Sequence, residues 1–243
     1  MPDHRSHRGP DPRDAGAFAP EMLPAIRAGV DHLSWLLTRG YAWKSALKIV
    51  GDRWGLTDRQ RMAALRCSCP DGSRDRREAH RTPIDRLRGE PLVVDGFNVL
   101  TTIEAALGGA PVLLARDGCF RDLAGVHGTY RKVEETRPAI DLVGEFLADR
   151  GVGPCLWCLD SPVSNSGRLA AVLREVAEGR GWDWSVELMF NPDARLASAP
   201  ETVATADAMI LDRSDRWANL AREAIEGRVP GAWVVDLSGA GPG

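Results

Sequence analysis

Apolar residues recur with a helical period over the early part of the chain. Between residues 21 and 37 they are spaced by three and four positions, which is typical of one face of an amphipathic helix. The same spacing predicts a second helix over residues 43–53, and Thr57-Asp58-Arg59-Gln60 has the form of a capping box that begins a third helix. We therefore expect a small all-α domain over residues 19–70.

A different pattern begins at residue 90, where short apolar runs alternate with helical periods. The runs predicted as strands are residues 91–95, 111–115, 154–159, 184–190, 202–206 and 232–237. The first run, residues 91–95, lacks the alternation of a half-exposed strand, so we expect it to be buried on both faces, as in a parallel sheet. Three helices are predicted between the strands: one that follows a cap at Asn98 and runs through Ile103, Ala106 and Leu107, one over residues 133–150 and one over residues 164–178. A long helix is predicted through Ile210 and Ile225. This alternation predicts one α/β domain over residues 90–238, with a mainly parallel sheet and helices on both faces.

The two ends of the chain and the segment between the domains are polar. Residues 1–18 lack the apolar core of a signal peptide and are expected to form a disordered tail, as are residues 239–243. No run is apolar enough for a transmembrane helix, which favours a cytoplasmic protein. Residues 71–89 are predicted to be an arginine-rich connector. Its arginines are Arg74, Arg76, Arg77, Arg81, Arg86 and Arg88.

Charge is unevenly distributed, although the net charge is only −3. Residues 1–90 carry 17 Lys and Arg against 12 Asp and Glu, a balance of +5, so the remaining 14 basic and 22 acidic residues give −8. A basic part that binds nucleic acid beside an acidic part that holds metal would explain this asymmetry, and solvated surface charge would explain it equally well. For the connector, contact with phosphate and a solvated linker are likewise both open.

The five cysteines do not form a disulfide framework in a chain of this length. Cys67 and Cys69, and Cys155 and Cys158, have spacings that suggest zinc ligands. However, Cys155 and Cys158 lie inside an apolar run, where a strand would direct the two thiols to opposite faces. We therefore predict buried free thiols.

Three aspartates share one local setting, because each follows a predicted strand and precedes a predicted helix. They are Asp95, Asp160 and Asp207. The carboxyl ends of parallel strands lie on one edge of the sheet, so these side chains are expected to converge. Carboxylates brought together repel one another unless a cation neutralises them, and an all-oxygen ligand set favours Mg²⁺ or Mn²⁺. The sequence thus predicts a metal site formed by these three aspartates.

Further residues are candidates for the same edge of the sheet. Asp122 is the fourth acid, with Asp117 and Glu134 as competing choices. Asn98 is expected to cap the helix that follows Asp95. The loop after Asp160 leads into a helix N-terminus, where its side chains either bind a phosphate group or only cap the helix. The residues proposed for supporting or substrate contacts are Asn98, Arg131, Ser164, Asn165, Ser166 and Asp212.

The run Leu92-Val93-Val94-Asp95-Gly96-Phe97-Asn98-Val99 resembles the first strand of the PIN-like nucleases, in particular the NYN subgroup, which opens with an Asp followed closely by an Asn. The resemblance covers about residues 90–238. It implies a Rossmann-like PIN-type sheet whose carboxylates hold Mg²⁺ or Mn²⁺ to cleave RNA. The later aspartates match that family by position only, and the family's acid on a mid-domain helix has no assigned counterpart here. Residues 19–70 resemble uncharacterised microbial helical domains often found ahead of PIN-like modules, which implies no activity.

Taken together, these patterns predict a Mg²⁺- or Mn²⁺-dependent nuclease whose partner is nucleic acid, with RNA favoured over DNA and the oligomeric state open. The alternative is a PIN-like module that binds RNA, or assembles with partners, without cleaving. A phosphatase of the haloacid dehalogenase type would need a second aspartate where this chain has Phe97. A dinucleotide-binding enzyme would need a glycine-rich motif after the first strand, and the sequence has none there.

Overall fold

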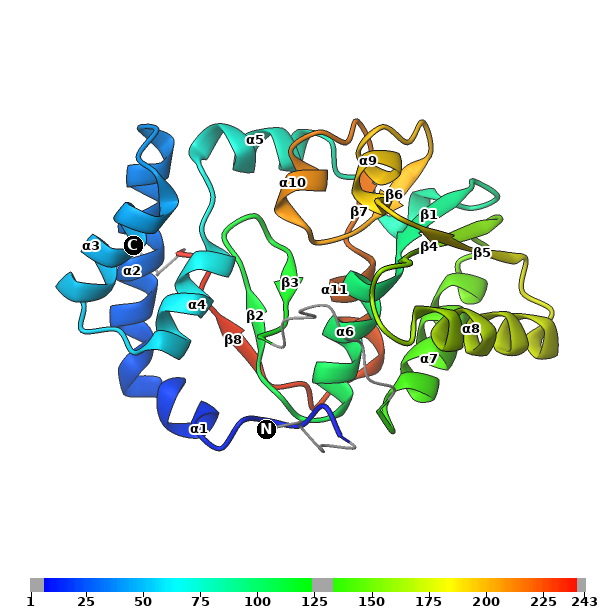
Figure 1. The fold of residues 1–243 in the computed structure, drawn as a ribbon, viewed down its shortest axis with the longest axis horizontal. Coiled ribbons are helices and arrows are strands. Elements are labelled where there is room, and N and C mark those ends of the chain that lie inside the picture. The colour runs from blue at the N-terminus through cyan, green and yellow to red at the C-terminus, as the bar shows by residue number, and fades with distance from the viewer. Residues whose placement is uncertain (1–6, 124–132, 240–243) are drawn as a thin grey trace.

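The computed structural model describes residues 7–123 and 133–239, and its centre is a parallel sheet (Figure 1). Its strands are β1 Leu92–Asp95, β4 Cys155–Asp160, β5 Trp184–Met189, β6 Thr202–Ala204 and β7 Trp217–Ala218. They lie in the order β5-β4-β1-β6-β7, and every neighbouring pair is parallel. Val94 pairs with Trp157 on one side and Ala204 on the other, so β1 is the middle strand. The prediction of an α/β fold with a mainly parallel sheet is confirmed.

Helices cover both faces of this sheet. Their bounds are α6 Gly96–Leu107, α7 Thr136–Asp149, α8 Ser166–Arg180, α9 Pro192–Ala197, α10 Ala208–Leu211 and α11 Leu220–Arg228. One face packs Val94 and Trp157 against α6, α7, α8 and α11, whereas the other packs Val93 and Cys158 against α9 and α10. Successive residues of β1 are therefore buried on opposite faces, which explains why the strand is a continuous apolar run.

A second, smaller sheet was not predicted. It contains β3 Phe120–Arg121, β2 Val112–Leu114 and β8 Val234–Asp236 in that order, with β2 antiparallel to β3 and parallel to β8. The sequence assigned the runs at 111–115 and 232–237 to the main sheet and residues 120–121 to a loop. An apolar run indicates a buried strand but does not specify which sheet the strand joins. In Figure 1 the second sheet stands between the main sheet and the N-terminal helices.

The N-terminal helical region has the predicted elements. They are α2 Leu23–Thr38, α3 Trp43–Arg53 and α4 Asp58–Cys67, preceded by α1 Asp14–Ala17 and a 3₁₀ turn at Pro20–Met22. Thr57 and Gln60 make both hydrogen bonds of the capping box that begins α4. The buried faces of α2 and α4 share one core with the second sheet, in which Val30 lies with Leu113 and Val235. These helices are thus packed onto the α/β part.

Two segments that were expected to lack structure are packed. In the predicted N-terminal tail, α1 contains Asp14, which is buried and forms an ion pair with Arg59 of α4. The predicted connector contains α5 Asp71–Ala79 and a 3₁₀ turn at Ile84–Arg86. Arg77 of α5 is buried among oxygen acceptors, not solvated, because its charged partners offset the cost of burial. Residues 1–6 and 240–243 lie outside the described residues.

The prediction of one long helix through Ile210 and Ile225 is wrong, because two helices and a strand occupy that segment. α10 ends at Leu211, and the chain then forms β7, which pairs with β6. Trp217 of β7 is fully buried, and its indole nitrogen donates to the Arg77 carbonyl at 2.6 Å. Burial of this large side chain in the sheet outweighs the helical period of the residues around it.

Two further expectations concern membrane spans and thiols. In the part of the chain that the structure describes, no helix has the length and apolar character needed to cross a membrane.

The five cysteines are free and buried, as predicted. Burial raises the pKa of Cys67 and of Cys155 to about 12, so neither thiol ionises near neutral pH.

Candidate active site

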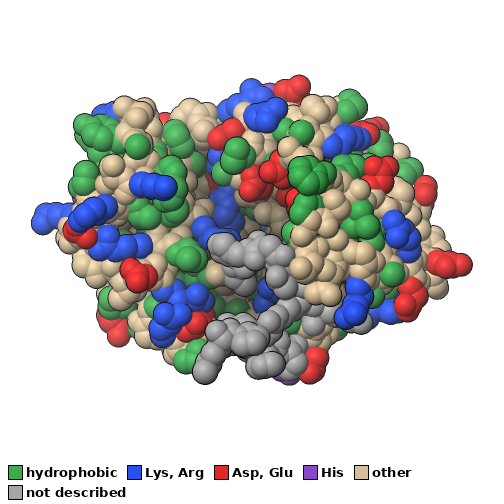
Figure 2. Space-filling view, in the orientation of Figure 1, with side chains coloured by type: hydrophobic (Ala, Val, Ile, Leu, Met, Phe, Trp, Pro, Cys, Tyr) green, Lys and Arg blue, Asp and Glu red, His purple; other side chains and the backbone are tan. Residues whose placement is uncertain are grey.

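The aspartates at the strand ends meet at one cavity. Asp95 ends β1, Asp160 ends β4 and Asp207 follows β6, so all three stand at the carboxyl edge of the parallel sheet. A cavity of about 560 Å³ opens there, and Asp122 lines it together with these three. Figure 2 shows a hollow in the middle of this face, with acidic side chains on its α/β side and basic side chains inside it. A parallel sheet imposes this convergence.

Asp95 has a strongly perturbed environment. Its side chain is largely buried, and burial raises the pKa of Asp95 to about 7. The Thr205 hydroxyl donates to Asp95 Oδ2 at 2.7 Å and lowers this pKa in part, whereas the charges of Asp207 and Asp193 raise it further. Ionising Asp95 in the folded protein therefore costs free energy unless a positive charge is nearby.

A fifth aspartate, Asp193, lines the same cavity and was not identified from the sequence. It lies in α9, which begins at Pro192 shortly after β5. Burial raises the pKa of Asp193, and the charge of Asp207 adds to this. Burial also raises the pKa of Asp160, to which Asp193 contributes. The sequence does contain a signal for the start of α9, because Asn191-Pro192 after a strand marks the start of a helix.

Asn98 supports the edge of the sheet that carries Asp95, Asp160 and Asp207, which we call the acidic edge. It does not do so as the predicted helix cap. α6 begins at Gly96, directly after β1, so Asp95 occupies the N-cap position and Asn98 lies inside the first turn. The Asn98 side-chain Oδ1 accepts a hydrogen bond from Ala206 N at 2.7 Å. Asp207 N also donates to the Thr205 hydroxyl, at 3.0 Å. The loop that carries Asp207 is thus fixed to both α6 and β1.

Asp207 and Asp212 stand at the two ends of α10. Asp207 Oδ1 accepts from Met209 N at 2.8 Å and from Ile210 N at 3.2 Å, so this carboxylate caps the helix as well as lining the cavity. Asp212, a predicted supporting residue, does not line the cavity and forms an ion pair with Arg77 at 2.7 Å. Its contact is therefore with the scaffold behind the acidic edge.

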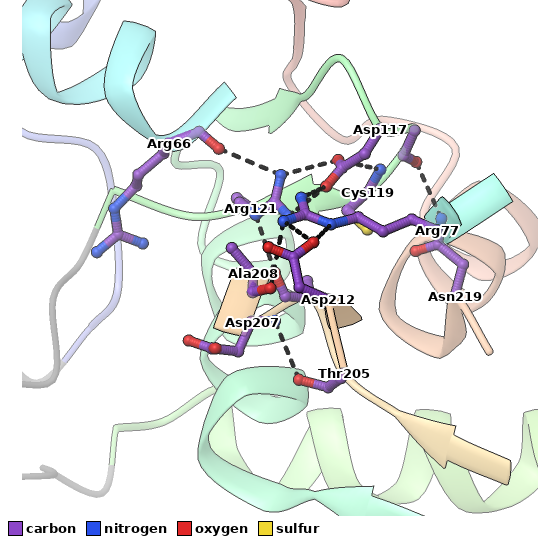
Figure 3. A network of polar contacts seen from close by, with 12 residues as sticks. Arg66, Arg77, Asp117, Cys119, Arg121, Thr205, Asp207, Ala208, Asp212 and Asn219 are labelled. Carbon is purple, nitrogen blue, oxygen red and sulfur yellow. Dashed lines mark hydrogen bonds and ion pairs between the residues drawn. The ribbon is translucent and has the colours of Figure 1, made fainter. Parts of the chain in front are cut away.

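Behind the Asp207 loop lies a buried network of charges (Figure 3). Asp117 accepts hydrogen bonds from Arg121 at 2.7 and 2.9 Å and from Arg77 at 2.6 Å. Burial alone would raise the pKa of Asp117, but these two guanidiniums outweigh it and hold the pKa below its usual range. Arg121 Nε also donates to the Ala206 carbonyl at 2.9 Å. Asp117, a competing choice for the fourth acid, is thus neutralised and does not line the cavity.

Asp122, the predicted fourth acid, faces the cavity from the segment after β3. It is buried, and the hydroxyls of Thr101 and Thr102 each lie 3.3 Å from its Oδ2. The remaining competitor, Glu134, is exposed and pairs with His7 at 3.3 Å. Of the three acids considered for the fourth position, only Asp122 joins the strand-end aspartates at the cavity.

The loop after Asp160 does not bring its candidate phosphate contacts to the cavity. Ser164, Asn165 and Ser166 are absent from the cavity wall. α8 begins at Ser166, whose hydroxyl donates to the Ser161 carbonyl at 3.4 Å, and Asn165 adopts a left-handed backbone conformation with φ 70°. This sharp turn before the helix is not signalled by the hydroxyl-rich sequence. Arg131 lies outside the described residues.

The set of carboxylates fits a hard divalent cation that is bound partly through water. Within residues 7–123 and 133–239, no three Asp, Glu, His or Cys side chains are grouped closely enough to hold a metal ion. Five carboxylates nevertheless line one cavity, and their mutual repulsion contributes to the raised pKa of Asp95 and of Asp193. Mg²⁺ commonly keeps several waters and binds one or two carboxylates. A hydrated ion would therefore neutralise these charges without three direct ligands.

Comparison with known proteins matches both parts of the chain to families. Residues 25–80 match a family model described as Protein of unknown function (DUF434). The chain is 29% identical over 187 residues to an uncharacterised protein of Methanocaldococcus jannaschii, a match that covers 77% of this chain and 89% of the other. No solved structure shows a significant match. Residues 84–223, or 140 of the 243 residues, match the model described as Domain of unknown function (DUF5616). Because this match spans more than half of the chain, the protein belongs to the DUF5616 family.

Proposed function

We propose that this protein is a Mg²⁺- or Mn²⁺-dependent nuclease that hydrolyses phosphodiester bonds, with RNA as the favoured substrate. The observation that carries the proposal is the common cavity of Asp95, Asp160 and Asp207, which come from the ends of parallel strands. The capping of α10 accounts for Asp207 but not for its convergence with the other two carboxylates, and the repulsion of the cluster costs stability unless a cation is bound. The resemblance of residues 92–99 to the first strand of PIN-like nucleases supports the same reaction.

Each residue at the edge has a distinct role in this proposal. Asp95 would hold the cation, and Asp160 and Asp207 would complete the site directly or through bound water. When bound, a divalent cation supplies Lewis acidity and charge neutralisation at the phosphate. Thr205 orients Asp95 through its hydrogen bond, and Asn98 holds the backbone next to Asp207. These contacts exist without substrate, so the carboxylates are positioned before the reaction begins.

The test compares wild type with Asp95→Asn on labelled RNA and labelled single-stranded DNA, in Mn²⁺, in Mg²⁺ and in chelator. Wild type is expected to cleave only with a divalent ion. Changes to residues that merely support a metal ligand cost about 10–100-fold in activity or metal affinity, so loss of a ligand should exceed that range. Asp31→Asn is the matched control, because Asp31 is exposed on α2 and does not line the cavity.

Two outcomes would contradict the proposal. Cleavage that persists in chelator, or that Asp95→Asn retains, excludes a mechanism that depends on this metal site. Absence of cleavage by wild type, with no rise in Tm on addition of Mn²⁺, would favour the alternative of a non-catalytic module that binds RNA or assembles with a partner. That alternative is supported by one observation, that the described residues contain no group of three side chains close enough to hold a metal ion directly.

A further inference from the structure

The cavity has a second wall, which the N-terminal helices provide and which we call the helical wall. Trp43 of α3 and Leu65 and Arg66 of α4 line the same cavity as the strand-end aspartates. In Figure 1 these helices stand on one side of the molecule and the main sheet on the other. A chain that passes through the cavity past the aspartates would therefore also contact the helical residues.

Trp43 belongs to a group of exposed aromatic side chains. It is 48% exposed, Trp35 is 52% exposed and Tyr41 is 53% exposed, whereas the other six tryptophans are buried or half-buried. All three aromatic residues lie within nine positions, around the junction of α2 and α3. An exposed ring forgoes a stabilisation of about 25 cal/mol for each Å² of apolar surface, so exposed rings at the mouth of a cavity mark a binding surface. Of the three, Trp43 is the one that lines the cavity.

Cationic side chains accompany these rings. The Arg39 guanidinium lies 3.6 Å from the centre of the Trp35 ring, and the Lys44 ammonium lies 5.4 Å from that of Trp43. Arg66 Nη1 donates to the Asp122 carbonyl at 2.9 Å. Among the described residues, the Nε and Nη2 groups of Arg66 make no hydrogen bond and can meet an anion. Aromatic rings interleaved with cations are the composition of surfaces that bind single-stranded nucleic acid.

We propose that the helical wall binds a single-stranded nucleic acid, with Trp43 stacked on an unpaired base and Arg66 in contact with a phosphate. This inference rests on the proposed function, because it names the kind of strand that the aspartates would cleave. The cavity of about 560 Å³ lies in the size range of small-molecule sites, so an unpaired nucleotide enters it and a base-paired helix does not. Arg66, which lines the cavity, and Lys44, which lies beside Trp43, carry the positive charge that complements the phosphates of such a strand.

Binding measured in chelator tests this wall separately from cleavage. Fluorescence anisotropy gives the affinity for a labelled single-stranded RNA and for the same RNA annealed to its complement. Trp43→Ala is expected to weaken binding of the single strand by about 5- to 150-fold, the range for loss of one base–aromatic stack. Trp43→Phe should retain the affinity. Ile49→Ala is the matched control, because Ile49 is exposed on the same helix and does not line the cavity.

The contact of Arg66 is tested by salt dependence. Loss of one phosphate contact is expected to reduce the slope of log affinity against log salt by about 0.7, the value for a single strand. Arg66→Gln should show this reduced slope and Arg66→Lys should not. Arg53→Gln is the control, because Arg53 is exposed on α3 outside the cavity. Single substitutions are used because deletion of the helical part would expose the core that α2 and α4 share with the second sheet.

The possible results distinguish failure of the inference about the helical wall from failure of the nuclease proposal. Wild-type affinity in Trp43→Ala and Arg66→Gln overturns the inference, even if Asp95→Asn abolishes cleavage. Equal binding of duplex and single strand, or no binding of either by wild type, also overturns it. Selective binding of the single strand that depends on Trp43 supports the inference even if wild type cleaves nothing, in which case only the nuclease proposal fails. Circular dichroism and Tm confirm that each variant is folded.

Discussion

Replacing Asp95 with asparagine is expected to stabilise the protein above neutral pH. Burial, with a contribution from the charges of Asp207 and Asp193, raises the pKa of Asp95 from its ordinary 3.8 to about 7. Between these two pH values the unfolded chain has lost this proton while the folded protein retains it, so the free energy of unfolding falls as pH rises. Above about pH 7 both states are ionised and the loss is complete.

The size of the effect follows from this shift in pKa. A shift from 3.8 to about 7 corresponds to about 4 kcal/mol, at about 1.36 kcal/mol for each pKa unit. An asparagine side chain keeps an oxygen that can accept from the Thr205 hydroxyl, which lies 2.7 Å from Asp95 Oδ2. For a chain of this length 1 kcal/mol shifts Tm by about 2–4 °C, so Asp95→Asn should raise Tm at pH 8 by up to about 16 °C.

The assay is thermal unfolding of wild type and Asp95→Asn from pH 4 to pH 9 in chelator. The two Tm values are expected to be similar at pH 4 and to diverge up to pH 8, with Asp31→Asn following wild type. Addition of Mn²⁺ at pH 8 should raise the Tm of wild type and narrow the difference, because a cation removes the cost of the Asp95 charge. An asparagine variant that is less stable than wild type at pH 8, or a difference that does not change with pH, would refute the reasoning.

Three other substitutions test contacts around the acidic edge. Asp117→Asn leaves the buried Arg77 and the largely buried Arg121 without their shared charged carboxylate and should cost about 3–5 kcal/mol, measured by urea unfolding. Asn98→Ala removes the acceptor of Ala206 N and should cost about 1–3 kcal/mol in the same titration; an unchanged midpoint would show that the loop is held elsewhere. Asp193→Asn removes one charge that raises the pKa of Asp95, so its Tm should fall less with rising pH than that of wild type.

The parts of the fold that follow from local pattern were predictable. Residues 92–95 and 155–160 are apolar runs buried on both faces, and each forms a strand of the parallel sheet. The runs around Leu113 and Val235 have the same character but join the second sheet, because there they pack against α2 and α4. That choice depends on contacts between segments far apart in the sequence, which an apolar period does not contain. The burial of Arg77 was unpredictable for the same reason, since its partners come from other elements.

At the candidate site, the convergence of carboxylates was predictable and the contacts among them were not. A strand followed by a helix places Asp95, Asp160 and Asp207 on one edge whatever their neighbours are. The interaction of Asn98 with Ala206 spans 108 positions, and local rules favoured a cap for Asn98 because that role needs only the adjacent helix. Asp193 was missed because α9 has six residues, too few to establish a helical period in the sequence.

The acidic edge depends on more of the molecule than the five-stranded sheet that carries it. Arg121 donates a hydrogen bond to the carbonyl of Ala206 at 2.9 Å, and Arg77 donates one to the carbonyl of Ala208 at 3.2 Å. The residues on both sides of Asp207 are therefore bonded to the network in Figure 3. Arg77 comes from α5 and Arg121 from the second sheet; both form ion pairs with Asp117, and Arg77 also pairs with Asp212. A buried ion network is stable only when all of its partners are in place, because one unpaired charge costs several kcal/mol. The position of Asp207 therefore depends on the docking of α5 and the second sheet against the main sheet, and a fragment that lacks either would not keep the same acidic edge.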